Sequence, residues 1–179
     1  MDIGADSCPC VRLLPLGSAR KASREIPRGG PGTVVKQTSF SFASADDHDA
    51  VAALLRGCGL PYEDIGEHLS DLIAARQGKT LIGTVALQAC DDVGLLRSLA
   101  VAQPYRSRGL ATDLVTRIVS HARSRRIDRL FLLTTTAQDF FAKRGFESID
   151  RSLVPAAIAG TQEFRSLCPG SAICMSQDI

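Results

Sequence analysis

Apolar residues between Leu110 and Ala122 recur every three to four positions and form a single stripe, which predicts an amphipathic helix. Residues 95–101, just upstream, are rich in leucine and valine and predict a strand. Residues 130–136 are almost continuously apolar before three threonines, a pattern typical of a strand buried on both faces of a parallel sheet. Strand, helix and strand together predict one right-handed βαβ unit.

The same pattern of apolar and polar positions divides the rest of the chain into short elements. Gly57 and Gly145 stand where helices are expected to end. The predicted elements are a strand over 38–43, a helix over 45–57, a second short helix over 61–69, a hairpin of 72–76 and 81–87 turned at 77–79, a closing helix over 137–145, a strand near 148–150, a helix from about 155 and a last strand near 172–175.

Residues 1–36 differ in composition from everything that follows. Gly, Pro, Ser and Arg dominate there and no period is sustained, so we predict a flexible N-terminal extension before one domain over 37–179. The basic residues of this extension have no aromatic residues between them, which favours a solvated tail over a nucleic-acid-binding arm.

Composition narrows the class of protein. The chain of 179 residues is 45% hydrophobic and 22% charged with a net charge of +2, which is ordinary for one globular domain and gives no reason to expect a nucleic acid or a membrane as partner. No leader is recognisable, so we expect a cytoplasmic protein with thiols in place of disulfides. Cys8 and Cys10 have no further ligands nearby, and no metal site is expected.

The turn between the predicted strand 95–101 and the helix that starts at Leu110 carries a candidate anion site. The first amides of a helix have no internal partners and the helix dipole is positive there, so an anion is stabilised. Gly109 permits close backbone approach, Ala111 keeps the next turn slim, and Arg106 and Arg108 add positive charge. The sequence contains neither a P-loop nor a dinucleotide-binding fingerprint, which leaves a different kind of pyrophosphate cradle.

This turn, [RQ]-x-x-G-x-[GA] at 106–111 after a Leu-Ala-Val strand end, resembles the acetyl-CoA loop of the GNAT N-acetyltransferase superfamily. Residues 137–146 resemble the superfamily's closing helix, A-x-x-F-Y-x-K-x-G-F. The resemblance implies an α/β (α+β) fold of element order β-αα-βββ-α-β-α-β: a single domain whose mixed twisted sheet has splayed central parallel strands and flanking helices. It further implies acetyl-CoA as co-substrate and an amine as acceptor.

The resemblance also implies the residues of the cofactor site. The backbone of Leu99 to Val101 is expected to hold the pantetheine arm, the amides of Arg108 to Thr112 the pyrophosphate, and the Val101 N–H the thioester oxygen as oxyanion donor. Direct attack by the amine then needs no covalent enzyme intermediate. The complete predicted cofactor set is Leu99, Ala100, Val101, Arg106, Ser107, Arg108, Gly109, Leu110, Ala111, Thr112, Phe140, Phe141 and Lys143.

One residue departs from the superfamily pattern. Phe141 stands where a tyrosine usually lies near the departing sulfur, and a phenyl ring cannot donate a proton. Ser98 or a water is a candidate replacement. The alternative is a non-catalytic acyl-CoA-binding regulatory module.

Arg97 is the predicted substrate-binding residue. Residues 96–101 resemble the IR[ST]LAV of amino-acid N-acetyltransferases, where the arginine grips the substrate carboxylate, and alternation along the strand is expected to place Arg97 on the face of Leu99 and Val101. The alternative is that this arginine is simply solvated or forms an ion pair with Asp91 or Asp92.

Residues 38–176 resemble, more narrowly, arsenic-resistance N-acetyltransferases, which would make an arsenic-bearing amino acid such as arsinothricin the substrate; an ordinary amino acid such as glutamate is the alternative. A homodimer is left open. The general base is not resolved among four polar residues of the second short helix: Glu63, Asp64, Glu67 and His68.

Overall fold

The computed structural model describes residues 37–179, so the extension predicted over residues 1–36, with Cys8 and Cys10, lies outside the described part. The strands are β1 (Thr38–Phe42), β2 (Leu72–Gln77), β3 (Thr80–Cys90), β4 (Val93–Val101), β5 (Arg129–Thr134), β6 (Glu147–Ile149) and β7 (Ile173–Asp178). The α-helices are α1 (His48–Gly57), α2 (Leu110–Ser124), α3 (Gln138–Ala142) and α4 (Ala156–Ala159), with the short turns η1 (Ala45–Asp47), η2 (Ile65–Asp71), η3 (Gln103–Tyr105), η4 (Arg151–Leu153) and η5 (Glu163–Leu167).

The seven strands form one mixed sheet in the order β1-β2-β3-β4-β5-β7-β6. The central pair β4 and β5 is parallel, while the other neighbours are antiparallel. β4 pairs with β5 only from Val93 to Leu95, opposite Arg129 to Phe131, so the rest of β4 diverges from its neighbour. The predicted mixed sheet with splayed central parallel strands is therefore confirmed.

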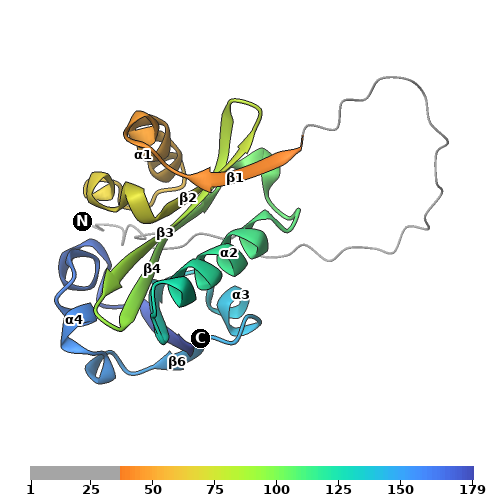
Figure 1. Ribbon diagram of the computed structural model, residues 1–179. Helices are drawn as coiled ribbons and strands as arrows, with labels where there is room; N and C mark the ends of the chain where they lie inside the picture. Colours follow the sequence, from red (N-terminus) through yellow and green to blue (C-terminus); the bar gives the residue numbers. More distant parts are fainter. Residues whose placement is uncertain (1–36) are drawn as a thin grey trace, which may run out of the picture.

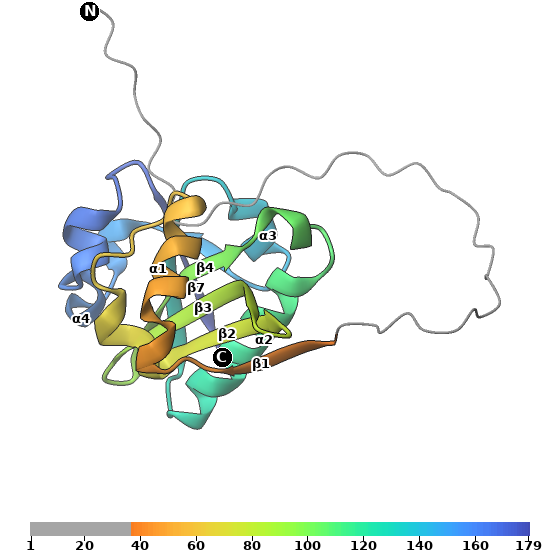
Figure 2. The same cartoon turned by 90° about the horizontal axis from the view of Figure 1, so that it is seen from above.

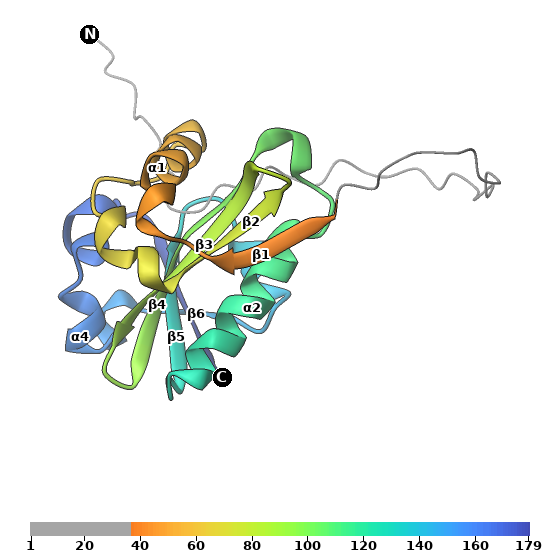
Figure 3. The same ribbon diagram turned by 45° about the horizontal axis from the view of Figure 1, so that its top comes forward.

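Helices cover both faces of this sheet (Figures 1, 2 and 3). α2 and α3 lie over one face, and α1, η2 and α4 lie over the other. The core follows this division: one cluster of buried residues packs beneath α2 and α3, a second beneath α1 and η2, and a third beneath α4 and the segment before β7. The sheet thus separates two differently lined sides of the molecule.

The helix α2 forms where the apolar stripe predicted it. Its buried residues are Leu110, Leu114, Val115, Ile118 and Ala122, which pack on β3 and β4. Gly109 caps its N-terminus in the left-handed conformation, at a φ of +87°, which glycine adopts without the steric penalty of a side chain.

Two of the predicted helices are shorter and less regular than expected. The segment predicted as a second helix over 61–69 forms the 3-10 turn η2, which starts at Ile65. The helix expected from about 155 is a single turn, α4, followed by the π-helical turn η5. Pro61 and Gly160, both poor helix formers, limit the length of these segments, and stretches this short gain little from the cooperativity of helix formation.

Candidate functional site

The turn before α2 has the geometry of an anion cradle. Ser107 and Gly109 both have positive φ, +60° and +87°, and residues 107–109 are exposed. Leu110 and Ala111 begin the helix, so their amides have no acceptor within it. A Cβ added at Gly109 would meet no heavy atom within 4 Å, which leaves open space beside the helix start. A pyrophosphate fits this combination of free amides, positive dipole and open space.

Some of the predicted cradle residues direct their polar groups to partners within the protein, and others are exposed to solvent. The Arg106 guanidinium lies at the end of β4, where Nε donates to the Val101 carbonyl at 2.8 Å and a terminal nitrogen lies 3.5 Å from the Cys58 sulfur. The Thr112 amide donates to the Gly109 carbonyl at 2.8 Å. Arg108 and Lys143 are exposed at the surface. In the described structure the backbone start of α2, with the charge of Arg108 nearby, is therefore the candidate cradle, and Arg106 supports the end of β4.

The peptide group of Val101 is oriented as the oxyanion role requires. Val101 faces Gly83 across β3 and β4, and the next amide, that of Ala102, donates to Ile82. In an antiparallel ladder successive residues point their amides to opposite sides, so the Val101 N–H points away from β3. Val101 also lies six residues beyond Leu95, the last residue of β4 paired with β5. Its N–H is consequently directed into the splay, although that role remains a prediction.

A β-bulge in β4 alters which side chains share a face. Ala86 faces Arg97 and Thr84 faces Ala100, so Ser98 and Leu99 together stand opposite Val85. Ser98 is buried with a φ of +54°, and the Thr84 hydroxyl donates to its carbonyl at 3.0 Å. An extra residue reverses the alternation of a strand.

The prediction that Arg97 shares a face with Leu99 and Val101 is therefore wrong. Leu99 and Val101 pack beneath α2, whereas Arg97 contacts Asp64, which directly precedes η2 on the opposite side of the sheet. The bulge thus places Arg97 on the side of the splay that faces away from the cradle.

Replacing Thr84 by valine tests how firmly this bulge is held. Valine keeps the shape of a fully buried side chain but removes the donor to the Ser98 carbonyl, so we expect unfolding free energy to fall by about 1–2 kcal/mol. Urea unfolding measures this loss. Thr84→Ser, which keeps the hydroxyl, is the matched control, and a loss of stability in Thr84→Ser with none in Thr84→Val would show that the methyl group matters and the hydrogen bond does not.

Arg97 is the centre of a buried ionic cluster, which we call the Arg97 cluster: Arg97, Asp64, Glu163 and His68. The guanidinium is 1% exposed and donates to both Asp64 oxygens at 2.7 Å each. Its Nε lies 2.7 Å from Glu163 Oε2, and Gln88 accepts a longer bond of 3.3 Å. His68 Nε2 lies 3.7 Å from Asp64 Oδ2. The alternative of an ion-paired arginine is what the structure shows, although with Asp64 and Glu163 as partners in place of Asp91 or Asp92.

Burial acts differently on the two carboxyl groups of the Arg97 cluster. Burial raises the pKa of Glu163, and the nearby Arg97 charge only partly opposes this. At Asp64 burial also disfavours the charged form, but hydrogen bonds from His68 and Arg97 and the Arg97 charge outweigh it and hold the pKa of Asp64 below its ordinary value. Asp64 is thus a fixed anion, and Glu163 is the carboxyl group that takes up a proton more readily.

The two aromatic residues of α3, Phe140 and Phe141, lie in the helix that is linked to the start of α2. Phe141 is fully buried and packs edge-on between Phe140 and Phe146. Arg144, which the sequence reading did not single out, stacks on the Phe140 ring at 3.4 Å and donates to the Thr112 hydroxyl in the first turn of α2. α3 is therefore tied directly to the cradle helix.

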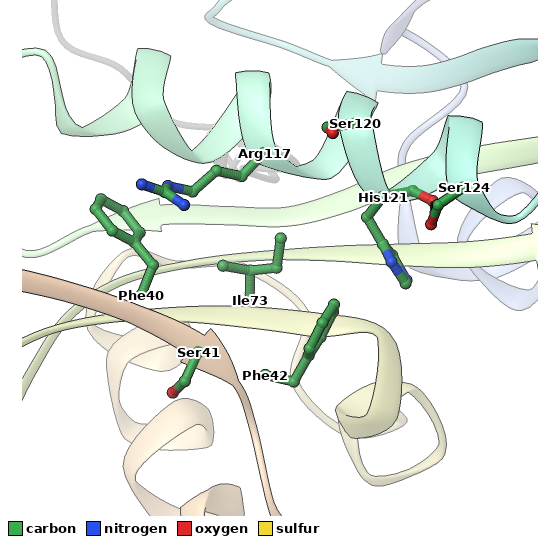
Figure 4. Close-up of a pocket in the computed structure, with 8 residues that line it drawn as sticks. All are labelled: Phe40, Ser41, Phe42, Ile73, Arg117, Ser120, His121 and Ser124. Carbon is green, nitrogen blue, oxygen red and sulfur yellow. Dashed lines mark hydrogen bonds between the residues drawn. The ribbon is translucent and has the colours of Figure 1, made fainter.

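Two of the hollows on the described surface lie at the end of β4 and along α2. One, of about 440 Å³, lies between α1 and η3 beside the Val101 carbonyl, and both Cys58 and Arg106 line it. The other, of about 380 Å³, lies between β1 and α2, where Phe40 and Phe42 face Arg117 and His121 (Figure 4). The first borders the end of β4 and belongs with the site; the second is formed by the other half of α2 and the sheet edge.

Other kinds of site find no support in residues 37–179. No group of three or more His, Cys, Asp or Glu side chains in this range is arranged to hold a metal ion. Over the same residues, every helix is too short or too polar to cross a membrane.

Comparison with known proteins gives a consistent picture. The model of the family described as acetyltransferase (GNAT) family matches residues 38–146. The amino-acid acetyltransferase of Pseudomonas fluorescens (strain Pf0-1) is 31% identical over 153 residues, which cover 77% of this chain and 35% of the relative. The enzyme of the same name from Neisseria meningitidis serogroup B is 30% identical over 144 residues, with 72% and 32% covered. The chain thus spans about a third of the length of these relatives.

Solved structures agree with the fold. N-acetylglutamate synthase from Neisseria gonorrhoeae, complexed with coenzyme A and L-arginine, superposes with a TM-score of 0.69 at 26% identity over 79% of this chain and 33% of that one. Rv2747 from Mycobacterium tuberculosis, in complex with coenzyme A and NLQ, superposes with a TM-score of 0.67 at 21% identity over 79% and 99% of the two chains. The latter similarity establishes the fold alone.

Proposed function

The chain belongs to the GNAT family of acetyltransferases, and on this basis we propose that it transfers the acetyl group of acetyl-CoA to the amine of a small amino-acid-like substrate. The observation that carries the proposal is the divergence of β4 from β5 after Leu95, next to the free amides that start α2. This arrangement offers a wedge for an extended thioester arm and an anion site at its end. The similarity to amino-acid acetyltransferases supports an amino acid as acceptor.

The chemistry proposed for the wedge needs few groups. The substrate amine attacks the thioester carbonyl, the Val101 N–H stabilises the oxygen that becomes negative, and the C–S bond breaks to release the thiolate of coenzyme A. Phe141 has no proton to donate, and Ser98 remains the predicted replacement. Positioning and one backbone donor would then supply most of the rate.

A thiol-release assay tests the function. Protein, acetyl-CoA and a panel of amines are mixed and free thiol is followed, with glutamate, other common amino acids and arsinothricin in the panel. We propose an arsenic-bearing amino acid as the preferred acceptor because residues 38–176 resemble the arsenic-resistance subgroup. Faster turnover of glutamate than of arsinothricin would make an ordinary amino acid the preferred acceptor instead. Binding of acetyl-CoA without turnover of any amine would favour a non-catalytic acyl-CoA-binding module. Phe141, which cannot donate a proton, is the residue that suggests this alternative.

The role of Arg97 needs a separate test. Because Asp64 and Glu163 already occupy its guanidinium, we propose that Arg97 acts on the substrate through these carboxylates and does not touch it. Arg97→Lys loses the planar fork, and we expect it to lower kcat/KM by about tenfold for an amino acid and for its decarboxylated amine alike, the equivalent of roughly 1.4 kcal/mol. A loss confined to the amino acid would restore direct recognition of the substrate carboxylate by Arg97.

A further inference from the structure

The charges of the Arg97 cluster do not balance among its three most buried members. Arg97 carries one positive charge, whereas Asp64 and Glu163 carry two negative charges when both are ionised. All three side chains are at least nine-tenths buried, where an uncompensated charge is costly. The cluster therefore needs one further positive charge or one proton.

His68 is the cluster member that can supply this charge. Its ring lies one helical turn from Asp64, with Nε2 at 3.7 Å from the carboxylate, and its side chain is 13% exposed while that of Asp64 is 6% exposed. Glu163 lies near enough for its charge to interact with that of His68. One proton, on either His68 or Glu163, makes the cluster neutral, and His68 is the more accessible of the two.

The position of the Arg97 cluster matches a need of the proposed reaction. An amino acid presents its amine as an ammonium group, which must lose a proton before it can attack a thioester. Arg97 directly precedes the Ser98 bulge, from which β4 continues to Val101, and η2 lies on the side of the sheet opposite the cradle helix. A histidine oriented by a carboxylate that an arginine in turn fixes is a recurring arrangement for a general base.

Resting on the proposed function, we propose that His68 is the general base of acetyl transfer and that the Arg97 cluster stores the proton it takes. Nε2 of His68 faces Asp64, so the ammonium group loses one proton to the other ring nitrogen, Nδ1; the neutral amine then forms the C–N bond, and the C–S bond breaks. The second proton of the nitrogen leaves with the collapse of the tetrahedral intermediate and neutralises the thiolate. One N-acetylated product, one free thiol and one proton result for each acetyl-CoA consumed.

His68→Gln tests this role, because glutamine keeps a polar contact with Asp64 but cannot take up a proton. We expect kcat to fall about 100-fold near neutral pH, coenzyme A affinity by calorimetry to stay unchanged, and the acidic limb of the pH profile of kcat to disappear. His48→Gln is the matched control: His48 lies on α1 on the same side of the sheet, half exposed, and its ion-pair partner is Asp49, outside the cluster. Its activity and pH profile should match those of the unaltered protein.

A second measurement is independent of activity. The titration of the His68 ring is followed by NMR in the unaltered protein, in Glu163→Gln and in Asp64→Asn. Removing either negative charge disfavours the imidazolium, so at a given pH a smaller share of the His68 ring should be protonated in both variants. Unchanged titration in both, or full activity and an unchanged pH profile in folded His68→Gln, would overturn the proposal. Absence of turnover by the unaltered protein on every amine would overturn the acetyltransferase function itself, while the titration still shows whether the cluster shares a proton.

Discussion

Gly109→Glu is expected to weaken coenzyme A binding at least 100-fold and to leave the fold intact. The added Cβ meets no atom within 4 Å, so the new carboxylate extends into the space beside the free amides of Leu110 and Ala111. There it would occupy the position proposed for the pyrophosphate and repel its charge. Calorimetric titration with coenzyme A measures the loss.

The strain of a side chain at positive φ has to be separated from this effect. Gly78 provides the control, because it also has a positive φ of +61° and open space around its missing Cβ, but it lies in the turn between β2 and β3. Both substitutions should lower the free energy of unfolding by a similar amount, about 1–2 kcal/mol. Gly78→Glu should bind coenzyme A normally. Equal coenzyme A affinities of the two variants would show that the start of α2 does not bind the pyrophosphate.

The parts of the fold that the sequence predicted well are those set by local patterns. The stripe of α2, the hairpin of β2 and β3 and the two strands around the cradle follow from periodicity and from glycines at element ends. The pairing limit of β4 at Leu95 was anticipated only through the family resemblance. Short elements such as η2 and η5 were not predicted correctly, because tertiary contacts decide the conformation of a segment of five to seven residues more than periodicity does.

The Arg97 cluster could not be predicted from the sequence for a different reason. A single extra residue at Ser98 moves Arg97 to the other face of the sheet. Serine rarely adopts a positive φ, so a serine in a strand pattern does not indicate a β-bulge as a glycine would. Glu163 lies 66 positions after Arg97 and comes from a segment of ill-defined helical character. Asp64, one of four polar candidates in the same predicted helix, is buried, and nothing in the sequence separates it from the other three.

Arg97→Met is the substitution expected to destabilise the protein most. It leaves Asp64 and Glu163 buried without their cation, and breaking a buried ion pair in this way costs about 3–5 kcal/mol. The midpoint of urea unfolding at neutral pH measures the loss. Because a protonated Glu163 needs less compensation, the loss should shrink as pH falls through the raised pKa of Glu163.

The triple variant Arg97→Met, Asp64→Asn, Glu163→Gln shows whether unpaired charge or lost packing causes this loss. It keeps nearly the same side-chain volumes but buries no ionised group, so most of the stability should return. The same variant lacks the carboxylates that orient and balance His68, so its acetyl transfer should stay low even though it folds. A triple variant as unstable as Arg97→Met would mean that the shape of the arginine, more than its charge, holds η2 and η5 against β4. A stable triple variant with full activity would instead assign the Arg97 cluster to folding alone.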